Sequence, residues 1–127
     1  MRLLTHNFLQ SNVKGTEKGY PLGIERGAEL SVESSPVNRN LVLKMLNKVD
    51  YSALVSITNN LREERQEDIP ELPPSLPETL EEETIANYHK VLFDVQLVNG
   101  FLVCPDTGRK FPVKDGIPNM ILHEDEI

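Results

Sequence analysis

The sequence predicts an α+β protein in which both flanks of the chain form a small antiparallel β-sheet and the middle forms a helical insert. Residues 34–94 contain no glycine and carry apolar residues at the three- and four-residue spacing of a buried helix face. Residues 1–33 and 95–127 contain short apolar runs separated by turn residues, which is typical of strands. We therefore expect a discontinuous β domain, 1–33 and 95–127, around a helical domain at 34–94.

Composition limits the class of protein. The 127 residues carry a net charge of −7, and 39% of them are hydrophobic. No stretch reaches the ~20 apolar residues of a membrane span, and the first ten residues lack the apolar region of a signal peptide. We therefore expect a soluble, intracellular protein. Its acidic balance and scattered basic residues argue against a nucleic-acid binder acting alone.

The first flank and the first part of the insert predict two strands and two helices. The strands are Arg2–Leu9 and Glu29–Glu33. Ser34-Ser35-Pro36 and Asn38 supply start signals for the first helix, and Asp50 can cap the second; each precedes an apolar helix face. These faces consist of Leu41, Val42, Met45, Leu46 and Val49 in the first helix, and of Leu54, Ile57 and Leu61 in the second.

The second part of the insert predicts a linker and a third helix. Four prolines interrupt residues 62–78, so we expect an extended, acidic, solvated linker; the alternative is a proline-rich recognition ligand. Thr79 and Glu82 match a capping box and begin the third helix. Its apolar stripe is Ile85, Tyr88, Val91, Leu92 and Val95.

The last flank predicts a meander of three strands. Asn99-Gly100 is expected to form a type I′ turn or a helix C-cap. The strands that follow are Phe101–Cys104, Arg109–Val113 and Ile117–Leu122, separated by turns at 105–108 and 114–116.

The sequence contains no pattern of an autonomous active site. The histidines His6, His89 and His123 are far apart and lack metal-ligand spacing. Because Cys104 is the single cysteine, no intramolecular disulfide can form. We expect Cys104 to be a small buried apolar residue and not a nucleophile. An enzyme built on Cys104 is the weakest of the functional hypotheses.

The segment Cys104-Pro-Asp-Thr-Gly looks like a zinc-ribbon knuckle, in which C-P-x-C-G turns two thiolates toward one metal. Thr107 stands at the second cysteine position, and a hydroxyl does not replace a thiolate on zinc. We therefore expect a small zinc-ribbon-like β unit that holds no zinc.

Two longer motifs carry a family resemblance that covers essentially the whole chain. The sequence opens with L-L-T-H-N-F-L and closes near G-R-K-F-P-V-K-D-G-I-P-N-M-I-L. With these motifs, the chain resembles the small methyltransferase-activating subunits of eukaryotes and archaea, the multifunctional tRNA methyltransferase activator subunits.

The resemblance implies a subunit without catalysis of its own. Members of this family form heterodimers with several class I methyltransferases, which modify tRNA, small-subunit ribosomal RNA and a translation release factor. S-adenosylmethionine is bound by the partner, RNA is reached only through the partner, and localisation in cytoplasm and nucleus follows the partners. Zinc-binding members use four cysteines that align here with Ser11, Thr16, Cys104 and Thr107.

The resemblance also implies where the partner binds. The segment Ile117–Leu122 is expected to extend the partner's sheet by β-augmentation, with an apolar patch beside it. The alternative is that its apolar residues are simply core residues of the meander. The expected partner-binding residues are Thr5, Asn7, Phe8, Phe111, Ile117, Pro118, Asn119, Met120 and Ile121.

The alternative function is a degenerate zinc-ribbon module that binds RNA or ribosomes directly. Its basic surface would come from residues that are separate in sequence and converge in the fold. These are Lys14, Lys18, Arg109, Lys110 and Lys114.

Overall fold

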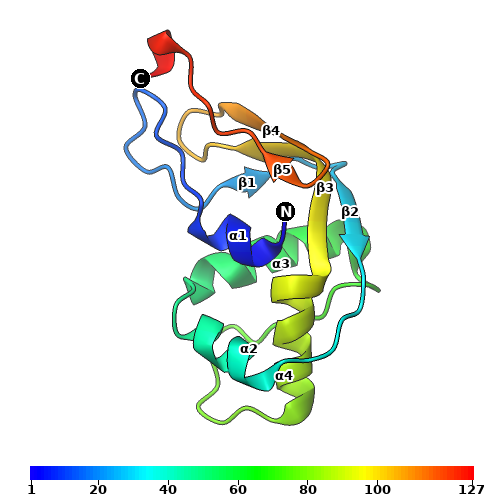
Figure 1. Cartoon of the computed structure of the whole chain (residues 1–127). Helices are drawn as coiled ribbons and strands as arrows, with labels where there is room; N and C mark the ends of the chain where they lie inside the picture. The colour runs from blue at the N-terminus through cyan, green and yellow to red at the C-terminus, as the bar shows by residue number, and fades with distance from the viewer.

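The computed structural model describes all residues, 1–127, and shows an α+β fold with a five-stranded antiparallel sheet and four α-helices (Figure 1). The class predicted from the sequence is therefore confirmed. The helices are α1 (Leu3–Phe8), α2 (Arg39–Leu46), α3 (Tyr51–Arg65) and α4 (Glu82–His89), with a π-helical turn at Lys90–Asp94 and a 3₁₀ turn at Glu124–Glu126. The strands are β1 (Gly23–Ile24), β2 (Glu29–Val32), β3 (Val95–Val103), β4 (Lys110–Lys114) and β5 (Ile117–Pro118).

The sheet is organised around the long strand β3. The first half of β3 pairs with β2, and its second half lies between β1 and β4. Strand β4 then pairs with β5, which forms the edge of the sheet. In Figure 1 the sheet occupies one end of the molecule, α2 and α4 occupy the other, and α1 lies between them.

The caps of α2 and α3 form as predicted. The side chain of Asn38 accepts a hydrogen bond from the N–H of Leu41, and Asp50 accepts one from Ala53. The predicted capping box of the third helix is wrong, because α4 begins at Glu82 with Glu81 as N-cap and has no side-chain cap bond. Three glutamates beside the positive end of the helix dipole still favour this start.

The predicted strand at Arg2–Leu9 is also wrong, because this segment forms α1. Its buried residues Leu3, His6 and Asn7 recur at the three- and four-residue spacing of a helix face. The residue before the helix start, Arg2, still makes a single bridge to Gln96 of β3. Only six residues are helical, so tertiary contacts rather than local propensity select the helix.

The predicted turn at Asn99-Gly100 does not form, and both residues lie inside β3. A Cβ at position 100 would come within 2.9 Å of the Cβ of Ala28, so glycine is required by close backbone approach and not by a turn. The third helix also ends earlier than predicted, since α4 passes through the π turn into β3 and Val95 is the first residue of that strand.

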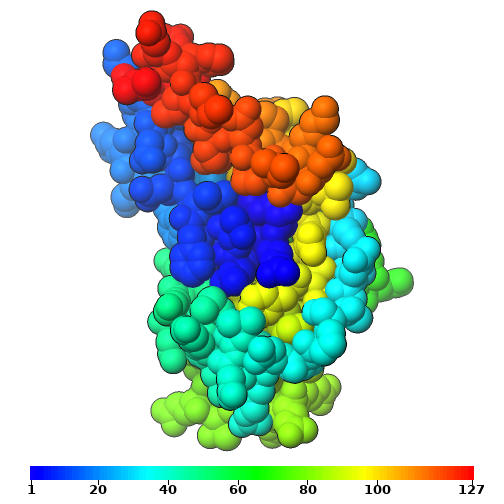
Figure 2. Space-filling model, in the orientation of Figure 1, coloured from blue at the N-terminus to red at the C-terminus, as the bar shows by residue number.

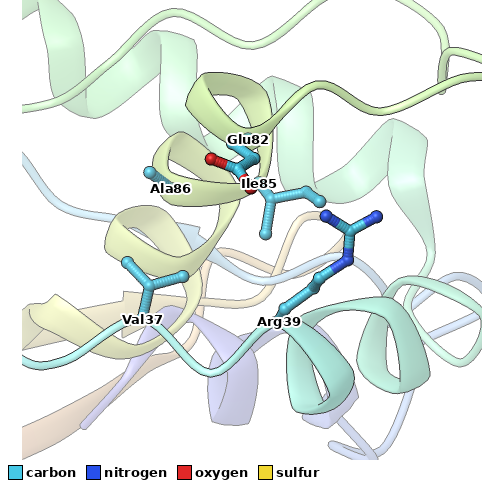
Figure 3. Close-up of a pocket in the computed structure, with 5 residues that line it drawn as sticks. All are labelled: Val37, Arg39, Glu82, Ile85 and Ala86. Atoms are coloured by element: carbon cyan, nitrogen blue, oxygen red, sulfur yellow. The ribbon is translucent and has the colours of Figure 1, made fainter.

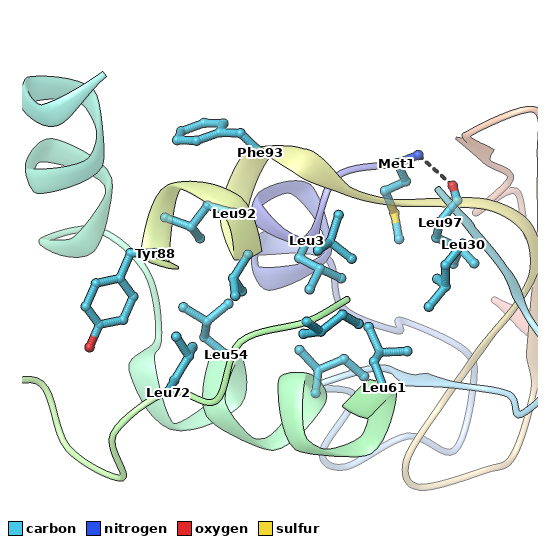
Figure 4. Packing of buried hydrophobic residues seen from close by; sticks show 14 of the residues in the cluster. Met1, Leu3, Leu30, Leu54, Leu61, Leu72, Tyr88, Leu92, Phe93 and Leu97 are labelled. Atoms are coloured by element: carbon cyan, nitrogen blue, oxygen red, sulfur yellow. Dashed lines mark hydrogen bonds between the residues drawn. The ribbon is translucent and has the colours of Figure 1, made fainter. Parts of the chain in front are cut away.

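A single cluster of 22 buried apolar residues runs between the sheet and the helices (Figure 4). It includes Ile69 and Leu72 from the segment that was predicted to be a solvated linker. That prediction is wrong for these residues, and Arg62–Arg65 still belong to α3. Tyr51 donates a hydrogen bond from its hydroxyl to the carbonyl of Pro73, which further attaches the segment to the helices. No helix has the length and apolar character needed to cross a membrane.

Candidate functional site

Large apolar side chains are exposed on α1 and on the segment that begins with the edge strand β5. Phe8 is 55% exposed, Ile117 is 71% exposed and Ile121 is 77% exposed, which is far more than usual for large apolar side chains in a core. In Figure 2 the orange segment near the C-terminus borders the dark-blue N-terminal segment. A Cβ on Gly116 would lie 3.0 Å from the nitrogen of Met1, which agrees with this proximity.

The segment 117–122 presents alternate residues to solvent and to the core. Ile117, Asn119 and Ile121 are exposed, whereas Met120 and Leu122 are half-buried and pack against the core cluster. This period of two is that of an extended chain. The structure thus separates the outward-facing apolar side chains, Ile117 and Ile121, from the apolar side chains that hold the segment in place.

The backbone of this segment is positioned by a tight turn. Asp115 has a φ of 51° and Gly116 a φ of 78°, the left-handed conformation of both central residues in a type I′ turn. The N–H of Asn119 donates to the carbonyl of Pro112 at 2.9 Å, and the N–H of Ile121 donates to the side chain of Asn119 at 3.0 Å. Strand β5 pairs with β4 on one side and ends the sheet on the other.

Two of the residues expected to bind a partner are not at the surface. Phe111 is 1% exposed and belongs to the core, so its side chain is unavailable to a partner in this structure. Asn7 is 3% exposed and has a different role. Its amide donates to the carbonyl of Asp50 at 2.9 Å and accepts from the N–H of Asp50 at 2.9 Å, which joins α1 to the cap of α3.

The remaining expected residues are accessible. Thr5, Phe8, Ile117, Asn119 and Ile121 are exposed, and Pro118 and Met120 are half-buried. Sequence reasoning missed Tyr20, whose hydroxyl donates to the carbonyl of Asn7 at 2.6 Å and so fixes the end of α1 next to Phe8. No sequence pattern connects residues 7 and 20, so this contact depends on the fold.

The four positions aligned with zinc-binding cysteines converge around Cys104. The Thr16 hydroxyl lies 3.6 Å from the Cys104 sulfur, and the Thr107 N–H donates to that sulfur at 3.5 Å. Burial raises the pKa of the Cys104 thiol, but hydrogen bonds from Ser11 and Thr107 outweigh burial and lower the pKa to about 6. One thiol and three hydroxyls do not match the donors of a structural zinc site, and no cluster of three or more His, Cys, Asp or Glu converges elsewhere.

The basic residues of the alternative RNA-binding function are partly neutralised. Arg109 binds both carboxylate oxygens of Glu126, at 2.5 and 3.1 Å, and Lys110 binds Glu25 at 2.7 Å. The hydrogen bonds from Arg109 lower the pKa of Glu126 to about 2, so this pair is charged at neutral pH. Two of the five basic residues expected for RNA binding are thus already engaged by carboxylates of this chain.

Comparison with known proteins gives a consistent result along the chain. Residues 2–116 match the sequence profile of the family described as Trm112p-like protein. The protein named multifunctional methyltransferase subunit TRM112 homolog A of Arabidopsis thaliana is 41% identical over 131 residues, covering 100% of both chains. The TRM112-like methyltransferase subunit of Mus musculus is 36% identical over 129 residues, covering 99% of this chain and 98% of its own. The subunit TRM112 of Saccharomyces cerevisiae is 27% identical over 134 residues, covering 96% of each chain.

Proposed function

Because the chain belongs to the Trm112p-like protein family, we propose that it is a non-catalytic subunit that activates and stabilises several S-adenosylmethionine-dependent methyltransferases. The proposed partners are class I methyltransferases that modify tRNA, small-subunit ribosomal RNA and a translation release factor. They bind the cofactor, and this chain carries none. Localisation in cytoplasm and nucleus follows from these partners.

The observation that carries the proposal is the exposed edge strand β5 with its outward apolar side chains. Ile117 and Ile121 are among the most exposed large apolar residues of the chain. Ile117 is the first residue of β5, which lacks a neighbour on one side, and Ile121 lies three residues beyond the end of that strand. The unpaired edge of β5 offers C=O groups to an incoming strand, and because Pro118 has no N–H, donors for that strand have to come from residues after Pro118. Alternate side chains provide contacts on the two faces of the segment. A partner sheet that pairs with β5 would cover both at once.

The enzyme gains stability through the same contact. A standard interface buries roughly 800 Å² on each partner, against a total accessible surface of 7674 Å² for this chain. Apolar area removed from water contributes about 25 cal/mol per Å². A methyltransferase with an apolar sheet edge would therefore remain soluble in the heterodimer and tend to aggregate without it.

We also propose that the loop at 11–19 and the turn at 104–108 form a zinc-ribbon-like knuckle in which hydroxyl groups replace thiolates. The convergence of Ser11, Thr16 and Thr107 on Cys104 supports this. The N–H of Ser11 donates to the carbonyl of Gly19 at 2.8 Å and joins the two ends of the loop.

The test is co-expression of the tagged chain with a class I methyltransferase from the same organism, followed by affinity purification and a methyl-transfer assay. We expect Ile117→Asp and Ile121→Asp to reduce the co-purified enzyme at least about tenfold, because each places a charge in a desolvated contact. Met120→Glu should reduce both binding and stability, since Met120 also packs against the core.

The matched control is Val37→Asp, which introduces the same charge at a 51% exposed apolar residue outside the 117–122 segment, beside α2 and α4. It should leave the yield of the complex unchanged. Circular dichroism must show that each variant is folded. Wild-type recovery of the enzyme with folded Ile117→Asp and Ile121→Asp would contradict the proposed contact surface.

A further inference from the structure

The strand β2 is connected to α2 by an exposed strap, residues 33–38, that has no regular secondary structure. Ser35 is its main attachment to the fold. The Ser35 hydroxyl donates to Asp94 Oδ1 at 2.5 Å and lies 2.9 Å from His89 Nε2, and the Ser35 N–H donates to Asp94 Oδ2 at 3.4 Å. A backbone bond from Glu33 to the Asp94 carbonyl at 3.2 Å adds one more contact.

The two partners of Ser35 are brought together by the π turn. His89 and Asp94 are five residues apart, and an i→i+5 turn stacks such residues on one side of the helix. Both are 5% exposed. The Asp94 carboxylate receives hydrogen bonds from Ser35 at both of its oxygens, and removal of such partners leaves a buried charge uncompensated.

The cluster has the residues of a hydrolytic triad but not its arrangement. In a triad the carboxylate binds His Nδ1 and the histidine accepts the serine proton. Here the serine hydroxyl donates to the carboxylate, and His89 Nδ1 is buried without a hydrogen-bond partner. The Ser35 hydroxyl therefore attaches the strap to Asp94 and is not positioned as a nucleophile.

The sequence adds an independent observation. Ser35 precedes Pro36, and no other serine or threonine in the chain is followed by proline. Proline restricts the residue before it to an extended backbone, the conformation in which protein kinases bind their substrates. We propose that Ser35 is a phosphorylation site for a proline-directed serine/threonine kinase, and that its phosphate releases the strap from the π turn.

The reaction needs only ATP and the kinase. The Ser35 oxygen forms a bond to the γ-phosphorus, the bond from that phosphorus to the β-phosphate oxygen breaks, and ADP leaves. The hydroxyl proton passes to the catalytic carboxylate of the kinase. Since the hydroxyl is engaged with Asp94, the kinase captures the strap when it opens locally.

The phosphate cannot occupy the position of the hydroxyl. It carries about −1.5 to −2 charges at pH 7 and would lie against the buried Asp94 carboxylate, so repulsion favours the released strap. Val37 then leaves the surface cavity of about 360 Å³ that it lines together with α2 and α4 (Figure 3). Release exposes the buried Ile85 side chain on the wall of that cavity.

The experiment treats the purified full-length chain with ATP and a mitogen-activated kinase, which is proline-directed, and maps phosphopeptides by mass spectrometry. We expect one phosphate, at Ser35, which Ser35→Ala abolishes and Ser34→Ala retains. Hydrogen exchange of the phosphorylated chain should then show about tenfold or greater loss of protection at the amides of Glu33 and Ser35. The variant Asp94→Asn removes the charge but keeps the shape of the side chain. In this variant, phosphorylation of Ser35 should reduce the protection of these amides much less than it does in the wild type.

Two results would overturn the proposal. One is phosphorylation of a peptide spanning residues 31–40 but not of the full-length chain, because the strap would then be closed to the kinase. The other is a Ser35-phosphorylated chain with unchanged protection at Glu33 and Ser35. Neither result bears on the methyltransferase role, since the strap lies at the helical end and β5 at the opposite end of the molecule (Figure 1).

Discussion

At the scale of single residues, His6 is a buried imidazole that the fold holds neutral. Its Nε2 lies 2.7 Å from the carbonyl of Leu22, to which the neutral ring donates. Burial lowers the pKa of His6 below its ordinary value of 6.5, and the bond to Leu22 offsets this only in part. The unfolded chain therefore binds a proton at higher pH than the folded chain does. The stability that His6 contributes is present above pH 6.5 and is lost as the pH falls from 6.5 through the folded pKa.

The resulting prediction concerns His6→Gln, which keeps a side-chain amide donor but does not titrate. We expect the free energy of unfolding of the wild type to fall more between pH 7.5 and pH 5 than that of the variant, as measured by urea unfolding. His123→Gln, which replaces an exposed histidine in the same way, is measured beside it as the matched substitution. An equal loss in wild type and His6→Gln would mean that another group dominates the acid sensitivity.

At the scale of elements, strand β3 needs a residue without a side chain at position 100, where the backbone passes close to Ala28. We expect Gly100→Ala to destabilise the protein by about 1–3 kcal/mol, because its Cβ would overlap Ala28 and the overpacked strand has to shift. Thermal unfolding of Gly100→Ala, Ala28→Gly and the double variant measures this. Since the Ala28 Cβ makes the closest contact, Ala28→Gly should recover part of the loss in the double variant. Additive losses would exclude this contact as the cause.

The same element shows what sequence reasoning can and cannot predict. Strands β2 and β4 and the caps Asn38 and Asp50 were predictable, because alternation and capping are local signals. The family was also predictable from the terminal motifs and is confirmed. In contrast, Asn99-Gly100 has the composition of a turn, but its glycine serves a contact with a residue 72 positions earlier, which is not visible locally.

The candidate site also combines features that the local sequence predicts with features that only the fold determines. That the segment 117–122 is extended follows from its composition, but which of its residues face outward depends on the register set by the turn at Asp115-Gly116. Asn7 and Phe111 occur in the family motifs, and only the tertiary structure shows that both are buried. Helix α1 was not predictable, because its six residues form a helix only through their contacts with the rest of the fold.

At the scale of the whole molecule, the sheet and the helices share one core, so we expect them to unfold together. Leu72 belongs to the proline-rich segment but is buried in that core. Leu72→Ala should reduce the free energy of unfolding by about 2–5 kcal/mol, with a single calorimetric transition. Leu76→Ala, at an exposed leucine of the same segment, is the control and should change it by less than about 0.5 kcal/mol. Two separated transitions, or loss of the helical signal alone, would mean that the halves are independent.

The alternation along residues 117–122 also has an evolutionary consequence. The inward residues Met120 and Leu122 maintain the fold, whereas Ile117 and Ile121 can be exchanged at little cost to stability. Under the proposed role of this segment in partner binding, mutations that alter recognition are thus separate from mutations that destabilise the fold. The proposed contact surface could therefore adapt to a changed partner by single substitutions at outward-facing positions, without loss of the fold.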